Sequence, residues 1–183
     1  MAYYYFDFQD VKKKDCYGLL SSLITQLAAE SNSCYDILSH LYSDNSDTNR
    51  GTRKPDIDTL KRFMKDILSL PEQGPIYIII DALDECPNSS GFPTAREEVL
   101  ELIEGLVDLS LPNVHLCVAS RPEVDIRSVL EPLTSRIISL HDEIGQKEDI
   151  VAYIKSVVYL DRRWKEEDKR LVIDTLSGKA NGS

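Results

Sequence analysis

Three carboxylates follow directly on a run of β-forming residues in the stretch IYIIIDALDEC, which spans residues 76–86. The run over residues 76–80 predicts a buried strand, and Asp81, Asp84 and Glu85 come immediately after it. For an isolated strand that ends in an acid, capping of a turn or simple solvation is the commoner explanation. Three acids within five residues repel one another unless a cation or hydrogen-bond donors lie nearby, so the spacing favours a binding site.

The chemistry that suits these residues is the binding of a metal-bound phosphate. A carboxylate at the last position of a strand can hold Mg²⁺ directly or through water, because Mg²⁺ prefers oxygen ligands and keeps several waters. We predict this metal-binding role for Asp81. A second carboxylate a few residues further on can orient or deprotonate the water that attacks a terminal phosphate, and Asp84 and Glu85 are the candidates for that catalytic role.

Strand and helix patterns alternate along the chain, and they determine where these acids would lie. The predicted strands cover residues 3–8, 76–80, 114–119 and 136–140. The predicted helices lie around residues 19–27, 34–42, 57–68, 94–107 and 125–130, with two further helical patterns after Gln146. Strands separated by helices pair in parallel and bind ligands at their carboxyl ends. We therefore predict an α/β fold with the acids at the mouth of a ligand site.

Two local patterns make this expectation more specific. Residues 76–80 and 114–119 are apolar at nearly every position, which is typical of central parallel strands that are covered on both faces. Thr94 and Glu97 have the spacing of a capping box, which predicts that a helix begins just after Thr94.

The composition excludes several classes of partner. The chain has 183 residues and a formal net charge of −10, which argues against nucleic-acid binding through clustered Lys and Arg. No apolar run approaches the ~20 residues that span a bilayer, so we expect no membrane insertion. The cysteines are far apart and lack the spacing of metal ligands, as in a reducing compartment: Cys16, Cys34, Cys86 and Cys117. We expect a cytoplasmic protein.

The acidic stretch resembles a known motif. IYIIIDALDE is similar to the extended Walker B motif of NACHT-type STAND NTPases, in which an apolar run is followed by Asp, a small residue, an apolar residue and Asp-Glu. VHLCVASRP, residues 114–122, resembles the sensor strand of the same family. The resemblance implies that Arg121 reaches toward the terminal phosphate of the nucleotide and that Ser120 shapes the turn beside it.

The likeness extends over most of the chain. Residues 3–28, YYYFDFQDVKKKDCYGLLSSLITQLA, resemble the segment after the phosphate-loop helix in fungal NACHT proteins of the nephrocystin-like N-terminal type, which are often joined to ankyrin or WD repeats. The resemblance implies a P-loop NTPase-like parallel sheet of the ASCE type, flanked by helices. Residues 1–145 would form an incomplete nucleotide-binding core, and residues 146–183 the truncated start of a helical subdomain.

The phosphate-binding loop of that family is missing from the sequence. The chain has eight glycines, and none fits Gly-x-x-x-x-Gly-Lys-(Ser or Thr), because the Gly178-Lys179 pair is followed by Ala180. In the family the loop precedes the strand found here at residues 3–8, so we expect it to be encoded just before Met1. In the family the strand that leads into this loop lies between the sensor strand and the next one. Residues 136–140 would therefore lack their neighbour and leave backbone edges exposed, or alternatively the strands would close up into an order that differs from the family's.

We therefore interpret the chain as a fragment of an ATP-dependent NACHT/STAND signalling switch. Mg²⁺ and ATP are the expected cofactors of the complete domain, and this chain alone is expected neither to bind ATP tightly nor to hydrolyse it. The alternative is a non-enzymatic interaction module, a degenerate remnant that binds another protein or another copy of itself. A metal-dependent phosphoesterase that uses Asp81, Asp84 and Glu85 is a third hypothesis, which we favour least because such sites usually recruit further Asp or His.

Overall fold

A computed structural model describes residues 1–30, 34–35, 39, 54–71, 73–89, 91–139, 144–161 and 163–179. The chain divides into two compact units, Met1–Thr134 and Ser135–Ser183. The assignment of residues 1–145 to a nucleotide-binding core and of residues 146–183 to a helical subdomain stays a prediction.

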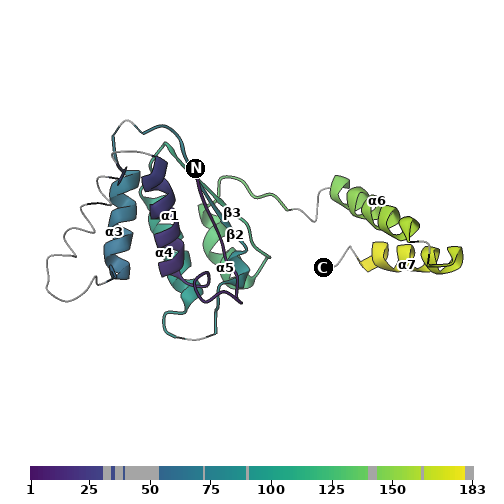
Figure 1. The fold of residues 1–183 in the computed structure, drawn as a ribbon. Helices are drawn as coiled ribbons and strands as arrows, with labels where there is room; N and C mark the ends of the chain where they lie inside the picture. Colours follow the sequence, from purple (N-terminus) through teal and green to yellow (C-terminus); the bar gives the residue numbers. More distant parts are fainter. Residues whose placement is uncertain are drawn as a thin grey trace. The chain divides into compact units, whose positions relative to one another are not determined.

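The first unit is built on a small parallel sheet of three strands in the order β1–β2–β3 (Figure 1). The strands are β1 (Ala2–Tyr5), β2 (Ile76–Asp81) and β3 (Val114–Val118). β2 lies in the centre, with Asp81 paired to Tyr5 of β1 and Ile80 paired to Val118 of β3. The parallel α/β fold predicted from the sequence is confirmed, and the acidic segment leaves the carboxyl end of the central strand.

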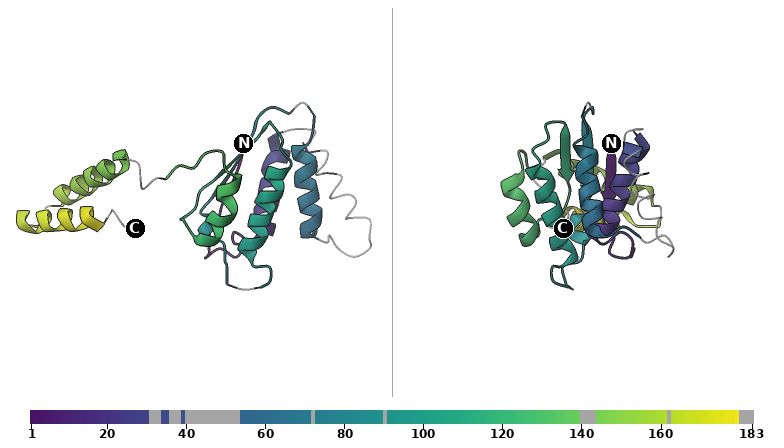
Figure 2. Two further views of the ribbon diagram at one scale, coloured as in Figure 1. Left: turned by 180° about the vertical axis from the view of Figure 1, so that it is seen from behind. Right: turned by 90° about the vertical axis from the view of Figure 1, so that its left-hand side faces the viewer.

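Helices and short turns connect these strands. They are α1 (Cys16–Glu30), α3 (Ile57–Leu68), the 3-10 turn η1 (Leu83–Glu85), α4 (Ala95–Asp108), α5 (Val124–Leu130) and the 3-10 turn η2 (Glu131–Leu133). α1 contacts both α3 and α4, and the three helices lie side by side (Figure 2). The capping box predicted for Thr94 and Glu97 is present at the start of α4. The helix predicted over residues 34–42 lies largely outside the described residues.

The helices cover one face of the sheet. Ile76, Ile78 and Ile80 of β2 are buried in a single apolar cluster with residues of α1, α3, α4 and α5. The alternate side chains of β2 point to the other face, where Tyr77 is 50% exposed and Asp81 is exposed.

The other two strands follow the same alternation. Tyr3, Tyr5, His115 and Cys117 are exposed in the part of the unit that the structure describes. The expectation of strands covered on both faces is therefore wrong. An apolar strand sequence indicates which side chains could be buried. It does not show whether a second layer of helices is present to bury them.

The prediction of a fourth strand over residues 136–140 is also wrong for the residues that the structure describes. Residues 136–139 have no regular structure, and Ile137 and Ile138 are largely exposed. A strand is stable only when a neighbour satisfies its backbone N–H and C=O groups, and β3 pairs only with β2 among the described strands. An isolated β-forming sequence without an adjacent strand therefore stays irregular.

The described residues of the second unit form two helices, α6 (Ile144–Leu160) and α7 (Glu166–Lys179), which pack against each other. They confirm the two helical patterns predicted for the tail. Lys169 of α7 is mostly buried and forms an ion pair with Glu166 at 3.0 Å. Within the described ranges, no helix combines the length and the apolar character needed to cross a membrane.

Candidate functional site

The loops that follow the three strands are held together by backbone hydrogen bonds at the carboxyl edge of the sheet. The Leu83 N–H donates to the Ala119 carbonyl at 3.1 Å, and the Ala119 N–H donates to the Ile80 carbonyl at 2.8 Å. On the other side, the Phe6 N–H donates to the Asp81 carbonyl at 3.0 Å. The segment after β2 thus lies between the segments that follow β1 and β3, and all the predicted site residues belong to this edge. We call residues 81–86 the acidic turn and residues 119–123 the sensor turn.

Asp81 lies on the uncovered side of this edge. Its carboxylate Oδ1 accepts a hydrogen bond from the Ala82 N–H at 2.8 Å, and the side chain is exposed. Ala82 has a φ of 53°, in the left-handed region that residues with a Cβ seldom adopt. The chain turns sharply at Ala82, and the residues on either side of it face different neighbours.

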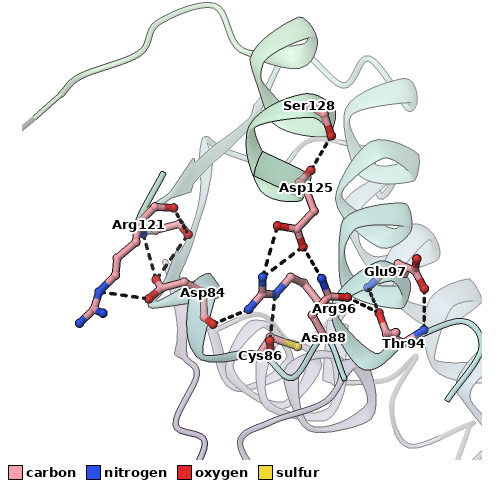
Figure 3. Close-up of polar contacts among 10 residues, drawn as sticks. Asp84, Cys86, Asn88, Thr94, Arg96, Glu97, Arg121, Asp125 and Ser128 are labelled. Carbon is pink, nitrogen blue, oxygen red and sulfur yellow. Dashed lines mark hydrogen bonds and ion pairs between the residues drawn. The ribbon is translucent and has the colours of Figure 1, made fainter. Parts of the chain in front are cut away.

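Asp84 faces the sensor turn. Its Oδ1 accepts the Arg121 backbone N–H at 3.0 Å, and its Oδ2 lies 3.5 Å from Arg121 Nε (Figure 3). The Ser120 hydroxyl is 3.4 Å from Asp84 Oδ1 but 2.9 Å from the Arg121 carbonyl. Because a hydroxyl donates one hydrogen, the shorter contact with the carbonyl is the stronger of the two. The structure therefore brings together three of the predicted site residues, Asp84, Ser120 and Arg121.

The two charged partners differ in exposure. The Asp84 side chain is only 13% exposed, whereas the Arg121 side chain is 82% exposed. The carboxylate is thus largely committed to protein donors, while the guanidinium remains accessible to an anion from solvent.

Glu85 faces a third direction. Its Oε2 accepts the Phe8 N–H at 3.4 Å, a long contact with the segment that follows β1, and the side chain is half-buried. In the described part of the chain, no group of three or more His, Cys, Asp or Glu side chains is arranged to hold a metal ion. The three acids that are close in sequence therefore do not converge on one point, which does not favour a multi-carboxylate phosphoesterase site.

Arg96 is a site residue that the sequence interpretation missed. It is buried on α4, and its Nε donates to the Cys86 carbonyl at 2.9 Å while Nη2 donates to the Asp84 carbonyl at 2.6 Å. Nη1 forms an ion pair with Asp125 of α5 at 3.1 Å (Figure 3). A signal was present, because Arg96 precedes Val99 by three positions and so shares the apolar face of α4.

The Cys86 thiol is buried behind this arginine. Burial raises the pKa of Cys86 to about 12, and the nearby Arg96 charge offsets only part of that rise. The main cause of this rise in the pKa is desolvation of the thiol. A thiol with so high a pKa stays protonated near neutral pH and is a poor nucleophile.

The site fits one half of a metal–nucleotide ligand. An exposed carboxylate such as Asp81 suits a hydrated Mg²⁺, which commonly binds one or two carboxylates and several waters. The phosphates need a glycine-rich loop with a Lys, and the 183-residue sequence contains no such loop. Asp81 would therefore contribute one ligand to a hydrated metal ion, whereas the sequence lacks the loop that would bind the phosphates.

Fold and site together define an α/β protein with a parallel sheet and an acidic edge. The family model described as "Nephrocystin 3, N-terminal" matches residues 1–121 of the 183, and the chain therefore belongs to that family. The matched segment contains the whole sheet and ends at Arg121, so it includes all the predicted site residues. Searches of the curated proteins and of the solved structures gave no match. The nephrocystin-like part of the resemblance is confirmed.

Proposed function

We propose that this chain carries the metal-binding and sensor part of a NACHT-type STAND ATPase switch with a P-loop NTPase-like core. The observation that supports this most directly is the contact between Asp84 and Arg121, which are 37 positions apart in the chain. The proposal assigns Asp84 to the Walker B motif and Arg121 to the sensor. Asp81, which the proposal assigns to the metal ion, is exposed three positions before Asp84 at the same edge of the sheet.

Each residue then has a defined task in the complete domain. Asp81 would hold the Mg²⁺ through one carboxylate, and the exposed guanidinium of Arg121 would meet the terminal phosphate. Bound ATP would supply the phosphoanhydride bond, and Mg²⁺ would offset the charge of its phosphates. Hydrolysis of that bond, or exchange of the nucleotide, would shift the domain between two arrangements. Asp84 is engaged by the Arg121 N–H, so as a base it would first have to release that donor. Glu85, whose one hydrogen bond among the described residues is the long contact with the Phe8 N–H, is the less constrained candidate for the base.

The isolated chain is proposed to bind ATP poorly, because its sequence lacks the phosphate loop. Calorimetric titration of the 183-residue chain with ATP in the presence of Mg²⁺ tests this. We expect no binding in the submillimolar range and no release of phosphate. Submillimolar binding that is lost in Asp81→Asn would contradict the proposal that the phosphate-binding half is elsewhere.

The switch itself is tested by mapping the 5′ end of the transcript. If the message extends upstream in frame through a Gly-Lys-Ser or Gly-Lys-Thr loop, the longer protein should hydrolyse ATP, and Asp81→Asn should abolish that activity. A message that begins at Met1 would contradict the switch, because the protein would then have no phosphate cradle. We also propose that the protein works in the cytoplasm, since its cysteines are free thiols.

A second candidate function is a non-enzymatic interaction module, and the uncovered face of the sheet favours it. That face carries the exposed aromatic side chains of Tyr3, Tyr5 and Tyr77, and exposed apolar clusters often mark protein contacts. The partner would be another protein module or a second copy of the chain, and neither nucleic acid nor a membrane. Light scattering over a range of concentrations tests self-association, which Tyr77→Lys should weaken. A monomer at all concentrations would exclude the second copy as partner.

A further inference from the structure

We infer that Arg96 is a positioning residue, which fixes the acidic turn against the sensor turn and thereby controls whether Asp84 and Arg121 stay in contact. The roles of the two turns in nucleotide binding rest on the proposed function, but the contacts that Arg96 makes do not. The starting observation is that one buried guanidinium joins the acidic turn to Asp125, in the first turn of the helix that directly follows the sensor turn (Figure 3).

The shape of the guanidinium determines what it can hold. Nε and Nη2 lie on one edge of the planar group and bind two backbone carbonyls of the acidic turn, those of Cys86 and Asp84. Nη1 lies on another edge and binds the Asp125 carboxylate at 3.1 Å. A lysine has a single ammonium group on a flexible stem and cannot hold three partners in this fixed geometry. Arg96 therefore sets the distance between the acidic turn and α5.

The position of α5 in turn sets the position of Arg121. α5 begins at Val124, and the Glu123 N–H before it donates to the Arg121 carbonyl at 2.8 Å. Asp125 lies in the first turn of the helix and also accepts a hydrogen bond from Asn88 Nδ2 at 2.8 Å. Any shift of Asp125 away from Arg96 would consequently move the sensor turn as well.

Burial strengthens the contacts that Arg96 makes with Asp125 and with the acidic turn. The Arg96 side chain is 10% exposed, so its charge depends on Asp125 for compensation. Asp84 is thus held from two sides, its carbonyl by Arg96 and its carboxylate by the Arg121 N–H. When Arg96 releases the carbonyl, the acidic turn loses one of the contacts that keep the carboxylate facing Arg121, and the hydrogen bond between the Leu83 N–H and the Ala119 carbonyl remains. Arg96 would in this way regulate the proposed site without touching a nucleotide.

The test is hydrogen exchange of the Arg121 amide, measured by NMR on the ¹⁵N-labelled 183-residue chain. In Arg96→Lys and Arg96→Met we expect this amide to exchange about tenfold faster through local opening, whereas the amides of Ile78 and Ile80 in the central strand change only as far as the global free energy of unfolding changes. Asp125→Asn, which preserves the shape of the side chain, should have the same effect in smaller measure. If the Arg96 variants do not fold, the exchange rate of the Arg121 amide in Asp125→Asn tests the inference instead. Arg127→Met is the matched control, because Arg127 lies on α5 in an exposed ion pair with Glu131.

Two results would overturn the inference. One is unchanged exchange at Arg121 in Asp125→Asn and in the folded Arg96 variants. The other is faster exchange that only parallels faster exchange at Ile78, because that would indicate general destabilisation and not a local release. Neither result depends on ATP. The proposed switch is tested separately by nucleotide titration and transcript mapping, and its failure would leave the positioning role of Arg96 intact.

Discussion

Asp81 and Asp84 are three positions apart, yet they lie in very different surroundings. Asp81 is exposed and accepts a hydrogen bond from its neighbour Ala82, whereas Asp84 is largely buried and meets the N–H and the guanidinium of Arg121. Among the described residues, no cation forms an ion pair with Asp81. The Asp84 carboxylate thus stabilises the contact between the two turns, and the Asp81 carboxylate remains available to a ligand.

The comparison explains how a dense acidic segment is tolerated. The charge of Asp84 is compensated by Arg121, and the carbonyl of Asp84 is held by Arg96 from the opposite side. Ala82 separates the two acids by a left-handed turn, which directs them to different neighbours. Acids that are close in sequence therefore need not form one site, because the conformation of the backbone between them determines which groups each carboxylate faces.

The largest effect is expected from removing the buried arginine that supports the Asp84 side of the comparison. Arg96→Met removes the ion-pair partner of the Asp125 carboxylate, which keeps its hydrogen bond from Asn88, and it removes the Arg96 donors from two carbonyls. It should therefore lower the free energy of unfolding by about 3 kcal/mol. The matched Arg127→Met, in an exposed ion pair, should cost at most about 1 kcal/mol. Urea denaturation of both variants measures the difference, and equal losses would contradict the bracing role of Arg96.

The next largest effect should separate the two acids directly. Asp84→Asn weakens charge-assisted hydrogen bonds in a largely buried position, so we expect a loss of about 1–2 kcal/mol. Asp81→Asn removes an exposed charge without an ion-pair partner among the described residues and should change stability by less than about 0.5 kcal/mol. Thermal unfolding of the two variants provides the comparison. A larger loss of stability in Asp81→Asn than in Asp84→Asn would contradict the claim that Asp84 is held by protein contacts while Asp81 is free to bind a ligand.

A smaller effect is expected at the turn between the acids. Ala82 has positive φ, and a β-branched side chain fits that conformation poorly, so Ala82→Val should cost about 1 kcal/mol. Ala82→Gly should be nearly neutral, because relief of strain offsets the greater freedom of glycine in the unfolded chain. Chemical denaturation measures both changes. A fully tolerated Ala82→Val would show that the left-handed turn is not required.

The smallest effect at neutral pH comes from the Cys86 thiol. Its pKa is raised from 9.0 to about 12, so between these values the unfolded chain loses a proton that the folded chain keeps. Stability is therefore unaffected below about pH 9 and falls as the pH rises from 9 toward 12. Cys86→Ala should make this decline shallower, whereas Cys117→Ala should not, since Cys117 is exposed. Denaturation curves measured across this range check the slope, and an unchanged slope in Cys86→Ala would contradict the burial of the thiol.

Local features of the fold followed from local sequence. The Ile-rich run before Asp81 predicted the central strand, and the Thr94–Glu97 spacing predicted the start of α4. The contact between Asp84 and Arg121 was not predicted, because it joins residues far apart in the chain. Features that depend on a partner element were mispredicted, as with the strand over residues 136–140.

The role of Arg96 shows why the rest was not predictable. A charged residue on the apolar face of a helix indicates a buried ion pair, but the sequence does not identify the partner. Asp125 is 29 positions away and becomes the partner only because α4 and α5 pack together. The two backbone carbonyls that Arg96 holds carry no signature in the sequence at all.

The most direct test of the division between Asp81 and Asp84 is paramagnetic line broadening by Mn²⁺, used in place of Mg²⁺ on the ¹⁵N-labelled chain. We predict broadening centred on the amides of Ile80, Asp81 and Ala82, which disappears in Asp81→Asn and persists in Asp84→Asn. Broadening that persists in Asp81→Asn, or that disappears in Asp84→Asn, would contradict the assignment of Asp81 as the carboxylate that is free to bind a metal ion.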